Sequence, residues 1–410
     1  GREYLDLFSM FASLSVGYNH PYVLKNKDRL SNAAINKPTN SDVYSLAMAE
    51  FVDTMGRLAQ PDYLPYSFFI SGGSLAVENA LKTAFDWKVR LNISKGKGEK
   101  GSKVIHFKQA FHGRSGYTMS ITDSPDPRKV MYFPQFDWPR ISNPFVKFPL
   151  DNKSEMDVEK REIIAKEEIK SAIKKYPDDI ACIIIEPIQG EGGDNHFRPD
   201  FFIFLKQVCL ENDMLLIYDE VQTGVGITGK MWAHQHLCSV ECSKNCSSYC
   251  LNTEPDIMSF GKKTQVCGIF AGKRLDMIDN HVFKESSRIN STWGGNLVDM
   301  VRFTIYLEII KSEKLVNNAA IMGQYLHSKL IALEKKYSNF LSNSRGKGLF
   351  CAIDLPSSEQ RDKIIELLYK EGALVLGSGS NSVRFRPHLN ISKNEIDIAI
   401  DMLDKSVGSL

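Results

Sequence analysis

Three segments of the sequence carry residue types that can bind or activate a small molecule. Gly73 and Ser74 follow an apolar run and precede a predicted helix, where free backbone N–H groups and the helix dipole favour a phosphate. Asp219 ends a second apolar run, at a position where α/β proteins place ligands. Lys262 and Lys263 precede a third, and burial of such a lysine lowers its pKa and makes the amine a nucleophile.

Each feature alone has an ordinary explanation as well: a tight turn, a helix cap or loop carboxylate, and a solvated lysine. The sequence around the glycines is neither GxGxxG nor a Walker pattern, which disfavours a nicotinamide or nucleotide enzyme. Taken together, a phosphate anchor, a carboxylate and a lysine are the parts that a pyridoxal 5′-phosphate site requires. The combination therefore predicts that cofactor.

The elements that must position these residues alternate between strands and helices. Short β-branched runs predict strands at 67–70, 103–107, 180–185, 214–218 and 265–271, and spaced apolar residues predict helices at 75–90, 155–175 and 201–212. This alternation is typical of an α/β fold with a mostly parallel sheet. Residues 94–102 and 238–254 are expected to be loops.

Beyond residue 310 the pattern changes to longer amphipathic segments. Helices are expected at 316–337 and 360–371, and short strands near 349–355 and 383–386. We therefore expect a large α/β domain and a smaller α+β C-terminal domain. The predicted division is an N-terminal segment at 1–45, a large cofactor-binding domain at 46–305 and a small domain at 306–410.

Composition excludes several classes of protein. The chain has 51 Lys and Arg against 49 Asp and Glu, a net charge of +2, which argues against a dedicated nucleic-acid binder. No stretch approaches the roughly 18 consecutive apolar residues of a membrane-spanning helix. Eight cysteines in 410 residues are too few for a disulfide scaffold. The low cysteine density favours a reducing compartment, so we expect a cytoplasmic protein, or a mitochondrial one if a leader before Gly1 was removed.

Four cysteines recur at every fourth position: Cys238, Cys242, Cys246 and Cys250. A helix would place them on one face, where thiolates hold zinc. They lack the close CxxC pairs of a typical zinc site, so a surface insertion with free or paired thiols is the favoured interpretation. We expect no metal site elsewhere.

The sequence resembles the class III, or ω-amino-acid, aminotransferases of pyridoxal-phosphate fold type I over nearly its whole length. The segments that carry the resemblance are NKPTNSDVY at 36–44, AVENALK at 76–82, FHGRSGY at 111–117, EPIQGEGGDNH at 186–196, DEVQTG at 219–224, FGKKTQVCG at 260–268 and NSTWGGN at 290–296. The segment at 238–252 is an apparent insertion relative to that family.

The resemblance implies roles for the cofactor residues. Lys262 matches the lysine that binds the cofactor covalently, and its neighbour Lys263 is the less favoured choice. Asp219 would pair with the pyridinium nitrogen and Gln222 would approach the phenolic oxygen. The remaining implied contacts are phosphate binding by Gly73, Ser74 and the other subunit's Thr292, and stacking by Phe111. His112 is expected to have a packing or hydrogen-bonding role rather than that of a general base.

The resemblance also implies the substrates. Arg114 would hold the far carboxylate of the amino donor, while Glu191 and Arg384 would form a switch that admits 2-oxoglutarate in the second half-reaction. The expected donor is L-lysine and the expected assembly a homodimer with shared active sites. Within the family, 4-aminobutyrate and ornithine are the alternative donors. A pyridoxal-phosphate aminomutase or racemase and a non-catalytic metal-binding protein are the alternatives from other classes.

Overall fold

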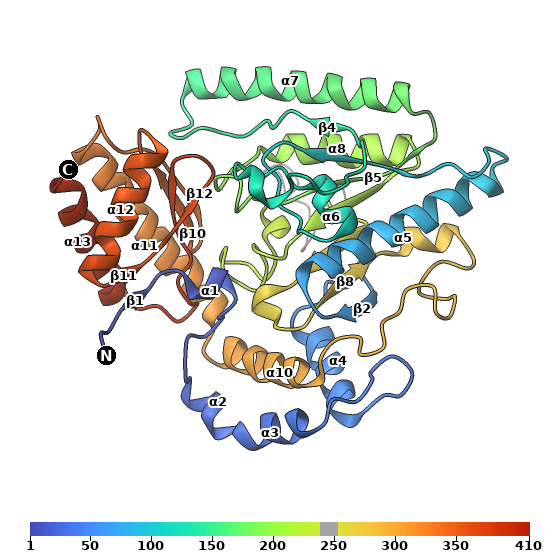
Figure 1. Ribbon diagram of the computed structural model, residues 1–410, viewed down its shortest axis with the longest axis horizontal. Helices are drawn as coiled ribbons and strands as arrows, with labels where there is room; N and C mark the ends of the chain where they lie inside the picture. The colour runs from blue at the N-terminus through green and yellow to red at the C-terminus, as the bar shows by residue number, and fades with distance from the viewer. Residues whose placement is uncertain (238–252) are drawn as a thin grey trace, which may run out of the picture.

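A mixed, mostly parallel sheet of seven strands forms the centre of the computed structural model, which describes residues 1–237 and 253–410 (Figure 1). Its strands lie in the order β2-β8-β7-β6-β5-β3-β4. Their bounds are Tyr66–Ile70 for β2, Lys103–Phe107 for β3, Arg140–Ile141 for β4, Ile180–Ile185 for β5, Leu215–Asp219 for β6, Ile257–Phe260 for β7 and Cys267–Ala271 for β8. Only β8 runs against the other six, so the carboxyl ends of those six strands lie at one edge of this sheet.

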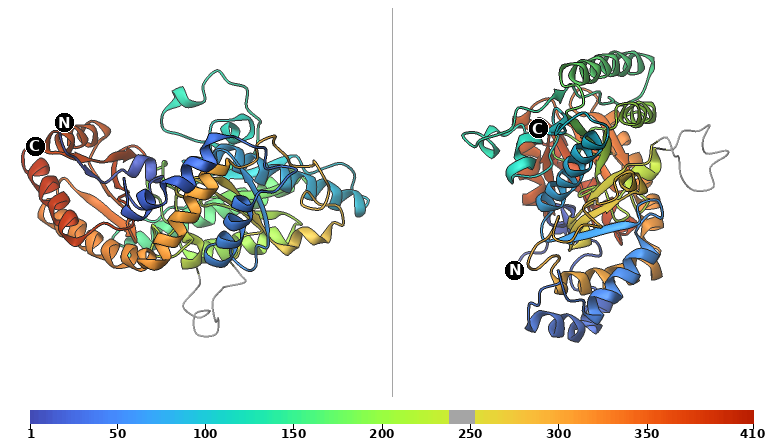
Figure 2. Two further views of the ribbon diagram at one scale, coloured as in Figure 1. Left: turned by 90° about the horizontal axis from the view of Figure 1, so that it is seen from below. Right: turned by 90° about the vertical axis from the view of Figure 1, so that its right-hand side faces the viewer.

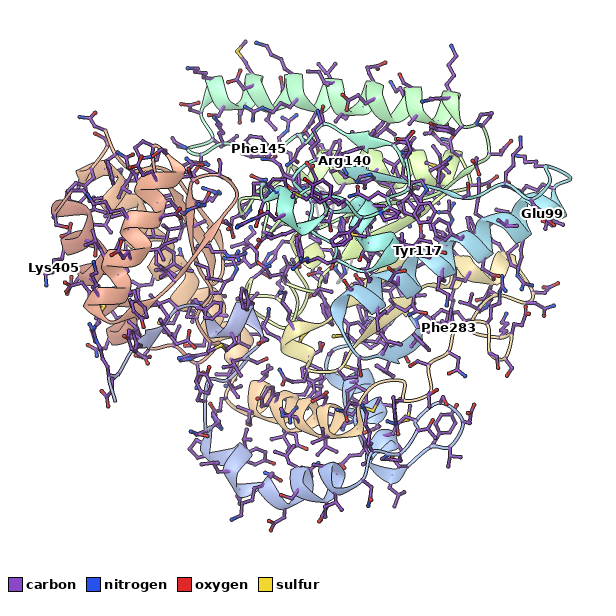
Figure 3. All side chains as sticks on the ribbon, viewed as in Figure 1. Glu99, Tyr117, Arg140, Phe145, Phe283 and Lys405 are labelled. Carbon is purple, nitrogen blue, oxygen red and sulfur yellow. The ribbon has the colours of Figure 1, made fainter. Side chains whose placement is uncertain are left out.

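Helices cover both faces of this sheet. They are α5 (Gly73–Ser94), α6 (Gly116–Ile121), α7 (Asn152–Lys175) and α8 (Pro199–Glu211). Because side chains alternate along a strand, Cys182 and Ile184 of β5 pack in the core under α5, while Ile183 and Ile185 pack in the core under α7 and α8. Tyr117 packs against the first of these cores and Phe145 against the second (Figure 3).

A second, smaller sheet lies at the C-terminal end of the molecule. It contains β12 (Leu376–Ser378), β13 (Ser382–Phe385), β10 (Phe350–Asp354) and β9 (Ser342–Lys347), in that order and all antiparallel. The helices α11 (Leu315–Lys336), α12 (Ser358–Glu371) and α13 (Lys393–Gly408) pack beside it. We call residues 315–408 the C-terminal unit.

The N-terminal residues join both parts of the molecule. Strand β1 (Leu5–Asp6) pairs in parallel with β11 (Ala373–Leu374) of the C-terminal unit. The helices that follow are α1 (Ser9–Ala12), α2 (Pro21–Lys25), α3 (Lys27–Ile35) and α4 (Leu46–Leu58), of which the last three pack against α10 (Leu297–Ser312). Both chain ends lie at the C-terminal unit (Figure 2).

The structure confirms the predicted α/β class with its mostly parallel sheet. The strands expected at 103–107 and 180–185 have the predicted bounds, and the others differ by one or two residues at either end. Several elements were not predicted, among them α4, α10, α13, β4 and β9. Two further omissions lie beside Lys262. Residues 257–260 form the separate strand β7, and a turn of 3-10 helix, η3 (Lys262–Thr264), joins it to β8. The pairing of β1 with β11 has no local sequence signal, because it depends on contacts between the two ends of the chain.

None of the described helices is long and apolar enough to cross a membrane. Residues 1–237 and 253–410 contain no group of three or more His, Cys, Asp or Glu side chains placed to hold a metal ion. Cys238, Cys242, Cys246 and Cys250 lie outside the described residues. The described cysteines, Cys182, Cys209, Cys267 and Cys351, are buried and free.

Candidate active site

A cavity of about 210 Å³ lies where the carboxyl ends of the strands meet. It is lined by Gly73, Ser74, Phe111, His112, Gly113, Glu186, Asp219, Val221, Gln222 and Lys262. These residues follow or end the strands β2, β3, β5, β6 and β7, so the carboxyl ends of five strands supply the cavity walls. The structure thus brings together the phosphate anchor, the carboxylate and the lysine that the sequence predicted.

Lys262 supplies the amine of the cavity. It begins the turn η3 with a φ of +53°, a left-handed conformation that is rare for residues other than glycine and clusters at functional sites. Burial lowers the pKa of Lys262, and the nearby Arg384 lowers it further, although Glu191, Asp219 and Glu186 oppose the shift. Its Nζ forms no hydrogen bond or ion pair with any residue that the structure describes. The amine is therefore available for chemistry.

Lys263, the neighbour, is buried and does not line the cavity. Its Nζ donates hydrogen bonds to the carbonyl oxygens of Gln222, at 2.7 Å, and Ala12, at 3.2 Å. Its amine is occupied by the backbone, which makes it a structural lysine. The structure thus distinguishes Lys262 from Lys263, which their neighbouring positions in the sequence could not do.

Asp219 is the buried carboxylate at the end of β6. Its Oδ1 accepts hydrogen bonds from the Val221 N–H, at 3.0 Å, and the Ser259 hydroxyl, at 3.3 Å. Its Oδ2 accepts one from His112 Nδ1 at 2.8 Å. His112 therefore has a hydrogen-bonding contact of the kind expected for it, and the three donors hold the Asp219 carboxylate in one orientation.

Glu186 is a second buried carboxyl in the cavity wall. Its two oxygens accept hydrogen bonds from the backbone N–H groups of Phe111, at 2.9 Å, and Gly190, at 3.0 Å. Burial raises its pKa to about 7; the charge of Asp219 adds to the rise, while His112 and the two backbone donors oppose it. Glu186 thus ties together the loops that follow β3 and β5.

The predicted phosphate anchor is the start of α5. Gly72 precedes this helix with a φ of +99°, and no side chain caps the helix. The first backbone N–H groups of α5 are therefore open to an anion at Gly73 and Ser74. The Ser74 hydroxyl also accepts a hydrogen bond from the Arg114 N–H at 2.9 Å, and a Cβ at Gly113 would lie 1.9 Å from that hydroxyl oxygen, so this close approach requires glycine.

Phe111 and Gln222 complete the cavity wall. The Glu186 hydrogen bond fixes the Phe111 backbone. The Gln222 side-chain oxygen lies 3.4 Å from both Nε and Nη2 of Arg386, a buried arginine that also pairs with Asp194.

Glu191 and Arg384 form an ion pair, as the switch hypothesis requires. Arg384 Nη2 lies 2.9 Å from Glu191 Oε2, and the Arg384 side chain is 5% exposed. Burial alone would raise the pKa of Glu191, but Arg384 and Lys129 outweigh that effect and hold the pKa below its ordinary value. The Lys129 contact, 2.7 Å from Nζ to Glu191 Oε1, was not predicted, because a lysine in a polar loop looks like any solvated lysine.

Four predicted site residues lie outside the cavity wall in this single chain: the ion pair of Glu191 and Arg384, and also Arg114 and Thr292. Arg114 follows Gly113 and is exposed, so its guanidinium is free to meet an entering molecule. Thr292 is exposed in the segment before α10, where its carbonyl oxygen accepts a hydrogen bond from the Thr39 hydroxyl.

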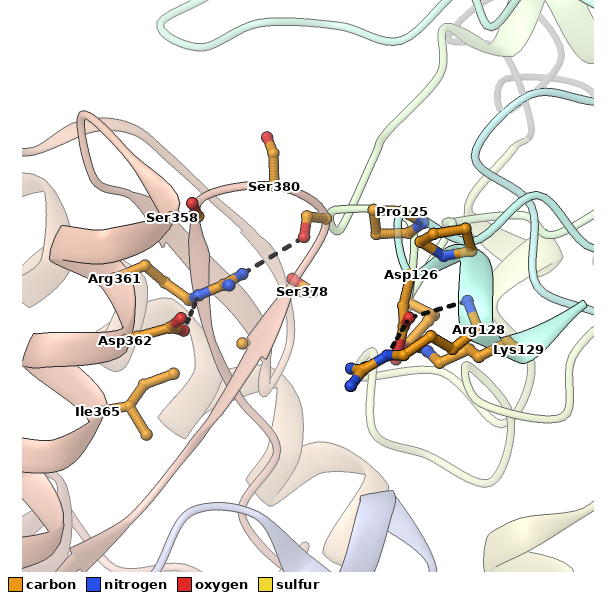
Figure 4. A pocket seen from close by; sticks show the side chains of 14 residues that line it. Pro125, Asp126, Arg128, Lys129, Ser358, Arg361, Asp362, Ile365, Ser378 and Ser380 are labelled. Carbon is orange, nitrogen blue, oxygen red and sulfur yellow. Dashed lines mark hydrogen bonds and ion pairs between the residues drawn. The ribbon is translucent and has the colours of Figure 1, made fainter. Parts of the chain in front are cut away.

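The residues of the cavity fit pyridoxal 5′-phosphate. An uncapped start of a 22-residue helix suits its phosphate, a buried and triply held carboxylate suits its pyridinium nitrogen, and an unpaired amine suits its carbonyl carbon. A separate cavity of about 660 Å³ opens beside Glu191, between α12 and the loop at 125–129 (Figure 4). Glu191 lines this second cavity, but Arg384 does not.

Comparisons with known proteins agree with this geometry. The family model described as "Aminotransferase class-III" matches residues 1–407. L-lysine-epsilon aminotransferase of Mycobacterium tuberculosis is 47% identical over 404 residues, covering 98% of this chain and 86% of that protein. A probable mitochondrial 4-aminobutyrate aminotransferase of Caenorhabditis elegans is 33% identical over 429 residues, covering 100% of this chain and 85% of that protein.

A solved structure has the same fold. Lysine aminotransferase from Mycobacterium tuberculosis, in the internal aldimine form, superposes with a TM-score of 0.94 at 46% identity, covering 100% of this chain and 91% of that one. This similarity confirms the predicted fold type over the whole chain.

Proposed function

Since this chain belongs to the class III aminotransferases, whose cofactor is pyridoxal 5′-phosphate, we propose that it transfers the ε-amino group of L-lysine to 2-oxoglutarate. The products are 2-aminoadipate 6-semialdehyde and L-glutamate. The observation that carries the choice of donor is the 47% identity to an L-lysine-epsilon aminotransferase across 98% of the chain, against 33% for the 4-aminobutyrate relative.

The cofactor would be held at five points of the cavity. The start of α5 at Gly73 and Ser74 binds the phosphate, joined by Thr292 of the partner subunit in a homodimer. Asp219 keeps a proton on the ring nitrogen, Phe111 stacks on the ring and Gln222 approaches the phenolic oxygen. When bound, pyridoxal phosphate withdraws electrons from the substrate carbon that loses its proton.

Lys262 is the catalytic lysine of this proposal. Its lowered pKa keeps a larger fraction of the amine uncharged at neutral pH, which suits both covalent attachment and proton transfer. Its position in the cavity, with no competing hydrogen-bond acceptor among the described residues, would let Nζ take the proton from the ε-carbon of the substrate and deliver it to the cofactor. Lys263 cannot do this, because two backbone carbonyls hold its amine.

The substrate residues distinguish the two half-reactions. While L-lysine reacts, Arg114 binds its α-carboxylate and Glu191 neutralises Arg384. When 2-oxoglutarate enters, Glu191 leaves and Arg384 binds the α-carboxylate of the acceptor. Arg384 Nε is buried without a hydrogen-bond partner among the described residues, so the guanidinium has a free donor for that carboxylate.

The visible spectrum of the holoenzyme tests the proposal. We expect L-lysine to remove the absorption band of the bound cofactor and 2-oxoglutarate to restore it. If only 4-aminobutyrate or ornithine removes the band, that compound is the donor instead. Turnover of an amine without any 2-oxoglutarate would favour an aminomutase or racemase.

We also propose that the chain divides at residues 45 and 305 and that the protein is cytoplasmic. The seven-stranded sheet within 66–271 and the second sheet within 342–385 support the division. Limited proteolysis tests the boundaries, and cell fractionation tests the location.

A further inference from the structure

Glu191 is held by two cations rather than one. Arg384 Nη2 lies 2.9 Å from Oε2, and Lys129 Nζ lies 2.7 Å from Oε1, so each carboxylate oxygen has its own partner. Lys129 ends the short helix η1 (Pro127–Lys129), in the loop on one side of the 660 Å³ cavity (Figure 4). The side chains of Lys129 and Glu191 are 22% and 25% exposed, while that of Arg384 is 5% exposed.

The backbone around Glu191 is fixed. The Gly379 N–H donates to the Glu191 carbonyl oxygen at 2.8 Å, and Arg345 donates to the carbonyl oxygens of Gly193 and Asp194. With its backbone held, Glu191 can leave Arg384 by rotation of its side chain. Both Glu191 and Lys129 line the 660 Å³ cavity, which provides room for that rotation on the side of Lys129.

We propose that Lys129 is a positioning residue that keeps Glu191 paired after Glu191 releases Arg384 to the dicarboxylate acceptor. This inference rests on the proposed function. A partly buried carboxylate that loses its only cation is costly, and it also repels the incoming carboxylate. Lys129 offsets this cost because its ion pair with Oε1 does not depend on Arg384. Lys129 is not needed in this way when L-lysine binds, because Glu191 then stays paired with both Arg384 and Lys129.

Four single variants of the holoenzyme and one double variant test this role. Lys129→Gln removes the cation, Lys129→Arg restores it, and Glu191→Gln removes the charge on which Lys129 acts. Arg128→Gln is the matched control, because Arg128 is next to Lys129 but is 82% exposed and pairs with Asp126. Calorimetry with glutarate, a dicarboxylate of the same chain length that has no keto group, measures acceptor binding without turnover. Stopped-flow spectra measure each half-reaction.

Lys129→Gln is expected to weaken glutarate binding about fivefold, the scale of a partly buried ion pair, and to raise the KM for 2-oxoglutarate similarly. The L-lysine half-reaction should stay unchanged. Lys129→Arg should recover most of the affinity, and Arg128→Gln should not alter it. In the Glu191→Gln background, Lys129→Gln should have no further effect, because Lys129 acts through Glu191.

Three results would overturn the inference. An equal loss in both half-reactions would give Lys129 only a structural role. An unchanged affinity for glutarate in Lys129→Gln would mean that Lys129 has no role in acceptor binding. A loss that persists in the Glu191→Gln background would mean that Lys129 contacts the acceptor directly. Failure of the proposed function is seen separately, in unmodified enzyme that does not react with L-lysine.

Discussion

Lys262 and Lys88 lie at opposite edges of the seven-stranded sheet, and burial lowers the pKa of both. Lys88 belongs to α5, and its Nζ donates to the carbonyl oxygens of Asn212, at 3.1 Å, and Asp213, at 2.8 Å, just before β6 begins. Lys262 lies at the carboxyl edge, in a cavity, and its amine has no such acceptor among the described residues. The two lysines therefore differ in their partners rather than in the direction of their pKa shifts.

This difference shows which property marks a functional lysine. Desolvation lowers the pKa of any lysine that leaves water, whatever its role. The amines of Lys88 and Lys263 donate to backbone carbonyl oxygens that would otherwise lack these hydrogen bonds, so both lysines stabilise the fold. An amine without acceptors, beside a carboxylate and an uncapped helix, can bind and react. The comparison predicts that substitution of Lys262 lowers activity, whereas substitution of Lys88 lowers stability.

The largest expected effect is that of Lys262→Ala. We expect turnover of L-lysine to fall at least about a thousandfold, because the variant loses both the covalent attachment and the proton-transfer group. The cofactor should still bind non-covalently through the start of α5 and Asp219. Steady-state kinetics and the visible spectrum measure the two outcomes.

Lys263→Ala is the control one residue along the chain. Since its amine binds only the carbonyls of Ala12 and Gln222, this variant should remain within about tenfold of the original activity and lose stability instead. Full activity of Lys262→Ala, or loss of all activity only in Lys263→Ala, would reverse the assignment of the two lysines.

Much of this site could be predicted from the sequence, because its residues sit at the ends of apolar runs. Asp219 ends strand β6 and Glu186 directly follows β5, and the rule that ligands bind at carboxyl ends applies to both. The choice of Lys262 over Lys263 could not come from spacing, because neighbouring residues share every local pattern. It came from the family resemblance. The structure supplies a physical reason, because Lys262 lines the cavity while the Lys263 amine donates to two backbone carbonyls.

Other parts of the site depend on contacts that no local pattern encodes. The ion pair of Lys129 with Glu191 joins residues 62 positions apart, and the pair of Arg384 with Glu191 joins residues 193 positions apart. Strand β7 was missed because it has only four residues, Ile257–Phe260, and it turns into β8 through the polar residues at 262–265. A sequence pattern predicts which faces are buried, but partners distant in the chain come from the assembled fold.

The second prediction concerns Lys88→Met, which keeps the apolar stem and removes the amine. The carbonyls of Asn212 and Asp213 lose a buried donor, so the free energy of unfolding should fall by about 1–3 kcal/mol. The kcat with L-lysine should not change, because Lys88 lies at the far edge of the sheet from the cavity. Urea unfolding and steady-state kinetics measure the two quantities.

Lys95→Met serves as the control for Lys88→Met. Lys95 forms an exposed ion pair with the Asp213 side chain at 2.6 Å, and exposed pairs contribute about 0–1 kcal/mol. If Lys88→Met destabilised the protein no more than Lys95→Met, the hydrogen bonds of Lys88 would not be structural, and the comparison with Lys262 would lose its basis.

The smallest expected effect is a pH dependence that belongs to Lys88. Burial lowers its pKa from the ordinary 10.5 to about 8, although Asp213 and Asp178 oppose the shift. Between these two values the unfolded chain binds a proton that the folded chain does not, so stability rises with pH by at most about 1.4 kcal/mol per pH unit. The contribution is complete above pH 10.5 and is lost as the pH falls through 8.

Urea unfolding of the original protein and of Lys88→Met at pH 7, 8, 9 and 10 tests this sign. Ionisations that the two proteins share cancel in the difference between their free energies of unfolding, which leaves the contribution of Lys88. That difference should be constant from pH 7 to 8 and then grow in favour of the original protein. A difference that stayed flat, or that shrank above pH 8, would mean that Lys88 keeps its proton inside the fold, held by carbonyls strongly enough to offset burial. The lowered pKa would then distinguish Lys262 from Lys88 after all.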